Sequence, residues 1–281
     1  MEIRLLTSAA IAAANDIVMR AYQSPSRLTE LERYLRLQPD GWFLAWESGQ
    51  AVGLAGTIDY GDFAYLGLVS VLPEAQRGGI GRALMRQILA WLAARDCPLV
   101  LLDASPVGQP LYQKLGFITT DASVVWGRAA ATHPPSAVRP PMGGIHLMEP
   151  TDIAEVVAYD RPRFGADRTA ALADLLMSHP RRAAFTRDAA GCITGFAIAQ
   201  PRILGPWLAD DVSSAAALLA WAWALDEPPT GMLVPAHNAQ AAALLTSAGF
   251  AVQRKLAHMR LGTGATRDRT THYGLASFTL G

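Results

Sequence analysis

A glycine-rich loop between an expected strand and an expected helix is the part of this sequence best suited to hold a phosphorylated ligand. Its residues are Gln76, Arg77, Gly78, Gly79, Ile80, Gly81 and Arg82. Because glycines lack side chains, successive backbone N–H groups can close around phosphate oxygens, and the helix that begins near Gly81 adds its positive N-terminal end. The two arginines supply positive charge. We therefore expect an anionic, phosphorylated ligand.

Other interpretations of this loop fit less well. A tight turn between strand and helix without any ligand would need neither arginine. A dinucleotide-binding loop needs a third glycine where this sequence has Leu84, and no lysine stands at the position that a P-loop requires. The pattern favours a phosphate-binding turn of another kind.

The elements around the loop are expected to form a sheet with covering helices. Alternating apolar residues and intervening turns predict an antiparallel meander, and the spacing of Leu84, Ile88 and Trp91 predicts an amphipathic helix after the loop. The expected strands are 42–47, 51–58, 63–71, 98–103 and one within 117–126, and the expected helices are 83–95 and 109–115.

The second half of the chain repeats this order. Residues 105–117 align with 238–250, and both segments end in Gly-Phe after an expected strand and an apolar helix that contains Ala-Trp. The same alignment places residues 210–215, which begin with Asp210 and Asp211, opposite the glycine loop. Two carboxylates would repel phosphate, so only the first copy is expected to bind the ligand.

A stretch rich in proline and glycine separates the two copies. Its proline pairs at 134–135 and 140–141 and its double glycine at 143–144 disfavour regular structure. We expect a first domain at 1–130, a linker at 131–144 and a second domain at 145–281.

Composition limits the class of protein. Lys plus Arg and Asp plus Glu number 24 each, so no basic excess suggests nucleic acid as a partner. Cys97 and Cys192 lie far apart and the histidines show no ligand spacing, which predicts neither a disulfide framework nor a metal site and fits a cytoplasmic protein. The longest apolar run, 215–225, is too short to span a membrane, and the first 16 residues indicate a strand and helix rather than an export signal.

Two motifs resemble the GNAT superfamily of N-acetyltransferases. The first is the family's Gln/Arg-x-x-Gly-x-Gly/Ala signature, here residues 76–81, and the second is Tyr112-x-x-x-Gly116-Phe117. The resemblance covers residues 1–130, and the second half is similar to the degenerate domain of tandem GNAT proteins. It implies an α/β (α+β) fold with two GNAT-like domains, each a mixed, mostly antiparallel sheet flanked by helices, with strands four and five splayed apart.

The same resemblance implies a binding mode for acetyl-CoA. The pantetheine chain would pair with the backbone of Val69, Ser70 and Val71, and the pyrophosphate would lie on residues 76–82. Ser105 is also expected to contact the cofactor, and transfer of a longer acyl group would depend on the depth of the cleft near Ser70 and Ser105. An amine would attack the thioester directly. Tyr112, protonated at neutral pH, is the expected general acid for the leaving thiolate.

The general base is left open by the sequence. The expected strand 63–71 contains no acidic residue, so Asp103 at the end of the next strand is one candidate, and Asp59, Asp62 or a chain of waters are others. The acceptor is expected to be a small-molecule or peptide amine, and the oligomeric state is not predicted. A module that binds acyl-CoA without turnover is the alternative function.

Three further segments allow two interpretations each. Trp207 and Tyr22 could form aromatic walls of an acceptor site or lie in the core. The charged cluster 160–168 could shape an acceptor pocket or cap a helix. The tail 271–281 could add an edge strand or cover a cleft.

Overall fold

The two halves of the chain repeat one order of secondary structure. The structure is a computed structural model that describes residues 1–128, 144–264 and 268–281. Nearly all of the predicted linker therefore lies outside the described residues. Each half follows the order β-α-α-β-β-β-α-β-α-β.

The first half matches the predicted order closely, with its helices and strands near the expected positions. In chain order they are β1 (Glu2–Leu5), α1 (Ile11–Tyr22), α2 (Leu28–Leu37), β2 (Trp42–Glu47), β3 (Gln50–Asp59), β4 (Ala64–Val71), α3 (Ile80–Ala93), β5 (Leu99–Ala104), α4 (Gln109–Gln113) and β6 (Ile118–Gly127).

The second half repeats these elements and adds one short strand. They are β7 (Ile145–Leu147), α5 (Ile153–Phe164), α6 (Thr169–Ser178), β8 (Ala183–Arg187), β9 (Ile193–Ala199), β10 (Leu204–Ala209), α7 (Val212–Trp223), β11 (Gly231–Pro235), α8 (Ala239–Ser247), β12 (Ala251–Gly262) and β13 (His272–Gly274). The predicted repeat is confirmed, and α7 is the apolar helix expected near 215–225.

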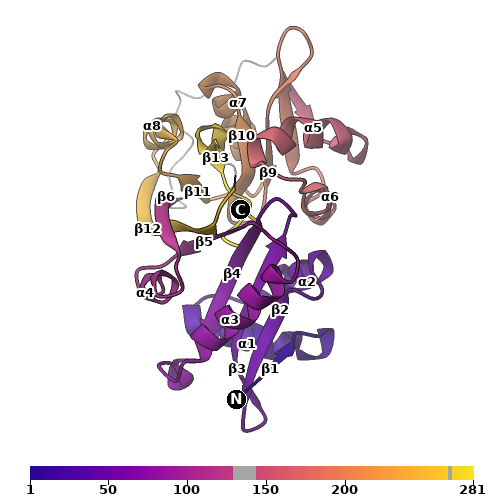
Figure 1. The fold of residues 1–281 in the computed structure, drawn as a ribbon. Coiled ribbons are helices and arrows are strands. Elements are labelled where there is room, and N and C mark those ends of the chain that lie inside the picture. The colour runs from indigo at the N-terminus through magenta and orange to yellow at the C-terminus, as the bar shows by residue number, and fades with distance from the viewer. Residues whose placement is uncertain (129–143, 265–267) are drawn as a thin grey trace.

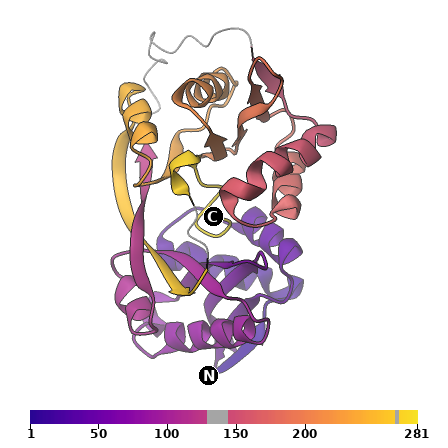
Figure 2. The same cartoon turned by 45° about the horizontal axis from the view of Figure 1, so that its top comes forward.

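The two halves exchange their last strands. The larger sheet has the order β1-β2-β3-β4-β5-β12-β6-β11, and the smaller one has the order β13-β10-β9-β8-β7. Thus β12, from the second half, lies between β5 and β6 of the first, and β6 separates β12 from β11. Figure 1 shows β6 and β12 side by side where the halves meet, and Figure 2 shows the same pair from a tilted view. Each half therefore depends on the other to complete its sheet.

The helices of the first half cover both faces of its sheet. A Cβ atom on Gly53 of β3 would lie 2.8 Å from Ile80 Cγ2, which places α3 on that face. Three residues further along β3, Gly56 lies opposite Trp42, whose ring stacks on Tyr34 of α2 at 5.3 Å. Because side chains alternate along a strand, α2 and α3 lie on opposite faces. We refer below to the α2 face and the α3 face of the sheet.

The strands β4 and β5 run parallel and then part. Their pairing extends from Ala64 opposite Val100 to Leu66 opposite Leu102. Beyond this point β4 contains a bulge. Leu54 is opposite Ser70 and Gly56 is opposite Gly67, so a step of two residues on β3 matches a step of three on β4. Within this step Leu68 has a φ of 52°. The bulge leaves one extra residue on β4 and bends the strand. The splayed strands of the predicted fold are thereby confirmed.

The last residues of the chain run from the smaller sheet onto the α2 face of the larger one. The Tyr34 hydroxyl donates to Ser277 Oγ at 3.2 Å, and the Tyr60 hydroxyl donates to the Leu280 carbonyl at 2.9 Å. A Cβ atom on Gly67 of β4 would lie only 2.3 Å from Thr279 Oγ1, so glycine is needed for this close approach. In Figures 1 and 2 the C-terminus accordingly lies between the two halves.

Candidate active site

The loop that was predicted to hold phosphate has an open helix N-terminus. Gly79 is the N-cap of α3, with a φ of 85°, and no side chain caps the helix. Residues 76–79 and Arg82 lie at the surface. The first N–H groups of α3 are therefore available to an anion. A Cβ atom at Gly79 would meet no atom within 4 Å, so the space in front of the helix is empty.

The two arginines of the loop are available to a ligand. Neither Arg77 nor Arg82 forms an ion pair within the parts of the chain that the structure describes. Arg77 has a φ of 68°, so left-handed residues occur at both 77 and 79. Two unpaired cations beside free helix amides favour a ligand that carries several negative charges.

The end of β4 presents backbone groups to the gap between β4 and β5. Leu72 N–H donates to the Val52 carbonyl of β3 at 2.9 Å, so the polar groups of Val71 point to the other side of β4, towards β5. The side chain of Gln76 donates to the Val71 carbonyl at 3.1 Å and ties the loop to the strand. The Val71 N–H faces the gap, as expected for a strand edge that can pair with an extended ligand.

Two other residues assigned to the pantetheine chain make internal contacts. The Val69 carbonyl accepts a hydrogen bond from the Tyr22 hydroxyl at 2.9 Å, and the Ser70 hydroxyl donates to the Leu68 carbonyl at 2.8 Å. Tyr22 comes from the end of α1 and is 49 % exposed, whereas Trp207 is fully buried. Of the two aromatic residues considered from the sequence, only Tyr22 lies at this site.

Tyr112 lies next to the loop on the short helix α4. A Cβ atom on Gly81 would lie 3.4 Å from Leu111 Cδ2 and 3.9 Å from Val71 Cγ2, so α4 packs against the start of α3 and the end of β4. Tyr112 is 8 % exposed, and no hydrogen bond to its hydroxyl occurs within the described ranges. Burial raises the pKa of Tyr112, and the nearby Tyr22 adds a smaller effect in the same direction. The hydroxyl is thus protonated at neutral pH and able to donate.

Ser105 shapes the turn that leads into α4. Its hydroxyl accepts a hydrogen bond from Gly108 N–H at 3.2 Å, and its carbonyl accepts one from Gln109 N–H at 2.9 Å. A Cβ atom on Gly108 would lie 3.2 Å from Tyr112 Cε2 and 3.5 Å from Ser105 Oγ. Ser105 therefore lies beside Tyr112, and its contacts position the helix that carries it.

Asp103, the first candidate for the base, is the centre of a buried hydrogen-bond network. Its side chain is 0 % exposed. It accepts hydrogen bonds from the Tyr65 hydroxyl and, at 2.6 Å, from Ser123 Oγ, and its Oδ1 lies 3.1 Å from His258 Nδ1. Arg269 in turn donates to Ser123 Oγ at 2.9 Å. Both carboxylate oxygens are occupied, so the contacts indicate a structural anchor between β4, β5, β6 and β12.

The electrostatics of Asp103 agree with this role. Burial opposes ionisation, but His258, then Arg269 and Ser123, outweigh it and lower the pKa of Asp103 to about 2. A carboxylate with such a pKa is a weak proton acceptor. His258 and Arg269 belong to the second half of the chain, and nothing in the sequence near Asp103 predicted these partners.

We expect Asp103→Asn to lower stability and to change the turnover of the folded protein little. The pKa of the carboxyl in the folded state lies below its unfolded value, so its contribution is present above about pH 4 and is lost as the pH falls towards 2. The free energy of unfolding should fall by about 2 kcal/mol at pH 7, as measured by urea denaturation. The exposed Asp62→Asn is the control. A large loss of kcat with unchanged stability would instead assign Asp103 to catalysis.

Asp59 and Asp62 lie at the other end of β4. Asp59 is the last residue of β3 and Asp62 lies in the turn that leads to β4, where Asp59 Oδ1 accepts a hydrogen bond from Gly61 N–H at 2.9 Å. Val69 is seven residues further along the chain from Asp62, which corresponds to roughly 20 Å of extended strand. These carboxylates are therefore too far from the splayed region to act as bases there.

The second copy of the site is closed by the chain itself. Asp211 caps α7, and its carboxylate accepts a hydrogen bond from Ser214 N–H at 2.8 Å, so an internal negative charge stands where the first copy has an open helix end. The neighbouring gap is filled by β13. This strand pairs with β10, and the Leu275 N–H that follows it donates to the Leu233 carbonyl of β11 at 2.8 Å.

The tail thus adds an edge strand and also covers a cleft. It adds a strand to β10 through β13, and it fills the gap between β10 and β11, which corresponds to the open gap between β4 and β5 in the first half. The other ambiguous segment, 160–168, forms internal contacts, because Arg168 and Asp160 make a fully buried ion pair at 2.6 Å.

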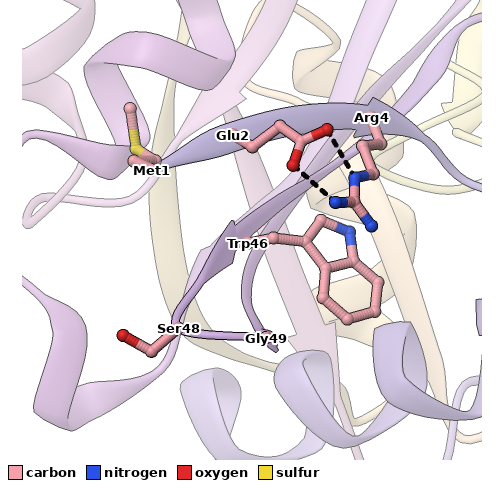
Figure 3. Close-up of a pocket in the computed structure, with 6 residues that line it drawn as sticks. All are labelled: Met1, Glu2, Arg4, Trp46, Ser48 and Gly49. Carbon is pink, nitrogen blue, oxygen red and sulfur yellow. Dashed lines mark hydrogen bonds and ion pairs between the residues drawn. The ribbon is translucent and has the colours of Figure 1, made fainter.

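A surface pocket elsewhere on the molecule does not belong to this site. Figure 3 shows that its lining comes from Met1 and β1, from Trp46 of β2, and from Ser48 and Gly49 in the turn that follows β2. Arg4 forms two hydrogen bonds with Glu2 and lies 5.4 Å from the centre of the Trp46 ring. The charges of Arg4 and Glu2 therefore already neutralise each other in this pocket. None of the lining residues comes from β4, the glycine loop or α4.

Comparison with known families supports the assignment of both halves. The Acetyltransferase (GNAT) family matches residues 11–117, and an Acetyltransferase (GNAT) domain family matches residues 156–274. The chain belongs to the GNAT acetyltransferase superfamily. It carries two GNAT domains in tandem, and the first match includes both the glycine loop and Tyr112.

Individual relatives agree with this membership. A mycothiol acetyltransferase of Streptomyces griseus subsp. griseus is 36 % identical over 31 % of this chain and 30 % of the relative. A holothin acyltransferase of Pseudoalteromonas sp. is 28 % identical over 52 % of this chain and 48 % of the relative. The matched segments thus span less than half of the length of either curated relative.

A solved structure matches the whole chain. A Pyrococcus horikoshii protein assigned as an acetyltransferase superposes with a TM-score of 0.86 and 26 % identity, covering 100 % of this chain and 95 % of that one. The likeness to this structure therefore extends over both GNAT domains.

The GNAT family implies an acyl-CoA co-substrate. Within the described ranges, no group of three or more His, Cys, Asp or Glu side chains is placed to hold a metal ion. No helix in the same ranges is long and apolar enough to cross a bilayer. Cys97 is half-buried and Cys192 is exposed, and both are free thiols.

Proposed function

We propose that this protein is an acetyl-CoA-dependent N-acetyltransferase whose first half is catalytic. The observation that carries the proposal is the uncapped N-terminus of α3, flanked by Arg77 and Arg82, at the mouth of the gap between β4 and β5. The pyrophosphate would bind the loop, and the pantetheine chain would lie along β4. The second half has a capped helix and a filled gap, which supports a single cofactor site.

The reaction we propose is direct acyl transfer. The lone pair of an uncharged primary amine attacks the thioester carbonyl, an amide bond forms and the carbon–sulfur bond breaks. The sulfur leaves as a thiolate and takes a proton from the Tyr112 hydroxyl, whose raised pKa keeps it protonated. The tyrosine and the new amide exchange protons with water, so that the products are an N-acetylated amine and CoA.

Solvent is the proton acceptor for the amine in this proposal. The residues of β4 include no acid, Asp103 is held in its network, and Asp59 and Asp62 lie at the far end of the strand. The acceptor would then have to lose its proton before it binds productively. The names of the relatives, mycothiol acetyltransferase and holothin acyltransferase, support acyl transfer with a small molecule as the acceptor.

A steady rise of rate with pH is the expected signature of this mechanism. Below the pKa of the acceptor amine, kcat/KM should increase by about tenfold per pH unit, because only the uncharged amine reacts. The raised pKa of Tyr112 means that no loss of the acid should follow up to pH 9. Thiol release from acetyl-CoA, followed from pH 6 to 9 with a panel of primary amines, measures this. A decline between pH 7 and 9 would contradict it.

A non-catalytic acyl-CoA-binding module is the second candidate function. It is favoured by the lack of a carboxylate base at the splayed strands. The thiol-release panel separates the two functions, because a binding module would hold CoA tightly and release no thiol with any amine.

A further inference from the structure

Arg254 on β12 lies on the same face of the large sheet as the buried Asp103. Side chains alternate along a strand, so Arg254, Leu256 and His258 of β12 point to one face and Ala257 points to the other. His258 contacts Asp103, which places Arg254 on the face of that network. This is the α2 face, because Tyr65 joins the same network and lies two residues before Gly67, which contacts the tail. The last residue of β5, Ala104, is opposite Ala257, so Arg254 extends past the end of β5.

The tail brings an aromatic ring to the same place. Ser277 is anchored by Tyr34, and Thr279 packs on Gly67 of β4. Between these anchors, Phe278 is partly exposed, and the Arg254 guanidinium lies 5.9 Å from the centre of its ring. This distance is within the range of a cation–π contact. In the part of the chain that the structure describes, this ring is the partner of Arg254, which makes no ion pair.

Tyr22 links this cluster to the reacting end of β4. Its hydroxyl donates to the Val69 carbonyl at the bulge, and about half of the residue is exposed. Burial of the hydroxyl raises the pKa of Tyr22, whereas Ser70, Arg254 and Arg27 act in the opposite direction. The guanidinium of Arg254 is thus close enough to act on a group in contact with β4. Arg27 is paired with Glu30 at 3.2 Å, so of the two cations that act on Tyr22, Arg254 is the one without an ion pair among the described residues.

We propose that the acceptor is a small amine that also carries a carboxylate, and that Arg254 binds this carboxylate. This inference rests on the proposed function. The amine would lie at the bulge of β4, where the thioester ends, and the apolar part of the acceptor would pack between the rings of Tyr22 and Phe278. The exposed guanidinium of Arg254 suits a carboxylate because a guanidinium can donate two parallel hydrogen bonds. The tail residues 277–280 lie on this face together with α2, and this cover favours a small acceptor over a folded protein.

The test compares matched pairs of acceptors in the full-length protein. Amino acids such as phenylalanine, leucine and glutamate are paired with their α-amides, and kcat/KM is corrected for the fraction of uncharged amine. We expect the wild-type protein to favour the acids by about tenfold or more, since hydrogen bonds between charged groups are stronger than those between neutral groups.

Substitutions identify Arg254 as the source of the preference. Arg254→Gln should raise KM for the acids by about tenfold or more and leave the amides within twofold, and Arg254→Lys should restore part of the preference. Lys255→Gln is the matched control, because Lys255 is an exposed cation on the opposite face of β12. It should change neither class of acceptor.

The outcomes separate this inference from the proposed function. Equal kcat/KM for acids and amides, or an equal loss for both in Arg254→Gln, would overturn the carboxylate site while leaving the acetyltransferase proposal in place. Absence of thiol release with every amine would overturn the proposed function itself and the inference with it.

Discussion

Gly79→Glu should abolish CoA binding by the whole chain. The new carboxylate would stand at the N-terminus of α3, in the empty space that we assign to the pyrophosphate, and would repel it at close range. A side chain at a φ of 85° adds strain of the kind that only glycine avoids. We expect affinity to fall on the order of 100-fold or more, as measured by calorimetric titration with CoA.

A matched control separates charge at the site from backbone strain. Gly61 also has a positive φ, 84°, lies in the turn at the far end of β4, and has no atom within 4 Å of the point where a Cβ would stand. Gly61→Glu carries the same strain and charge and should bind CoA like the wild type. Gly79→Gln should bind more tightly than Gly79→Glu. Normal affinity in Gly79→Glu would show that the cofactor lies elsewhere.

Tyr112→Phe should reduce turnover while leaving cofactor affinity nearly unchanged. The ring remains to pack against Phe117 at 6.0 Å, so the substitution removes only a hydroxyl that has no hydrogen-bond partner in the described ranges. Loss of a general acid lowers rates by about 100-fold or more. We expect this loss in kcat for amine acetylation, and a CoA dissociation constant within about twofold of the wild type.

Tyr273→Phe serves as the control for this variant. Tyr273 is buried in β13, and its hydroxyl donates to Gln240 Oε1 at 3.1 Å in the second half. Its removal should cost some stability and leave kcat unchanged. If Tyr112→Phe were as active as the wild type over the whole pH range, the leaving thiolate would take its proton from another source and the assignment would fail.

The parts of the site that could be predicted from sequence are those that depend on local chain geometry. Gly79 stands where the turn needs a positive φ, and the apolar spacing after Gly81 marks the helix that follows, so the turn and α3 were predicted from the residues themselves. The parting of β4 from β5 was predicted only through the resemblance to the GNAT superfamily. Asp210 and Asp211 likewise marked the second copy as different, and Asp211 now proves to cap α7.

The parts that could not be predicted depend on contacts between distant segments. No pattern in the sequence marked 251–262 as a strand, and β12 pairs with β5 about 150 residues away because the halves exchange their last strands. The partners of Asp103 follow from this exchange, since His258 arrives with β12. The position of the tail on Gly67 and beside β10 also follows from packing that no short motif encodes.

The most direct test of a single cofactor site in the first half is hydrogen–deuterium exchange with and without saturating CoA. The uncapped amides of α3 and the gap-facing edge of β4 should become protected, so our account predicts slower exchange in peptides that cover residues 69–82. Peptides that cover 204–215 and 272–276 should not change, because Asp211 and β13 already occupy the corresponding positions. Protection confined to those second-half peptides, or no protection at all, would contradict the account.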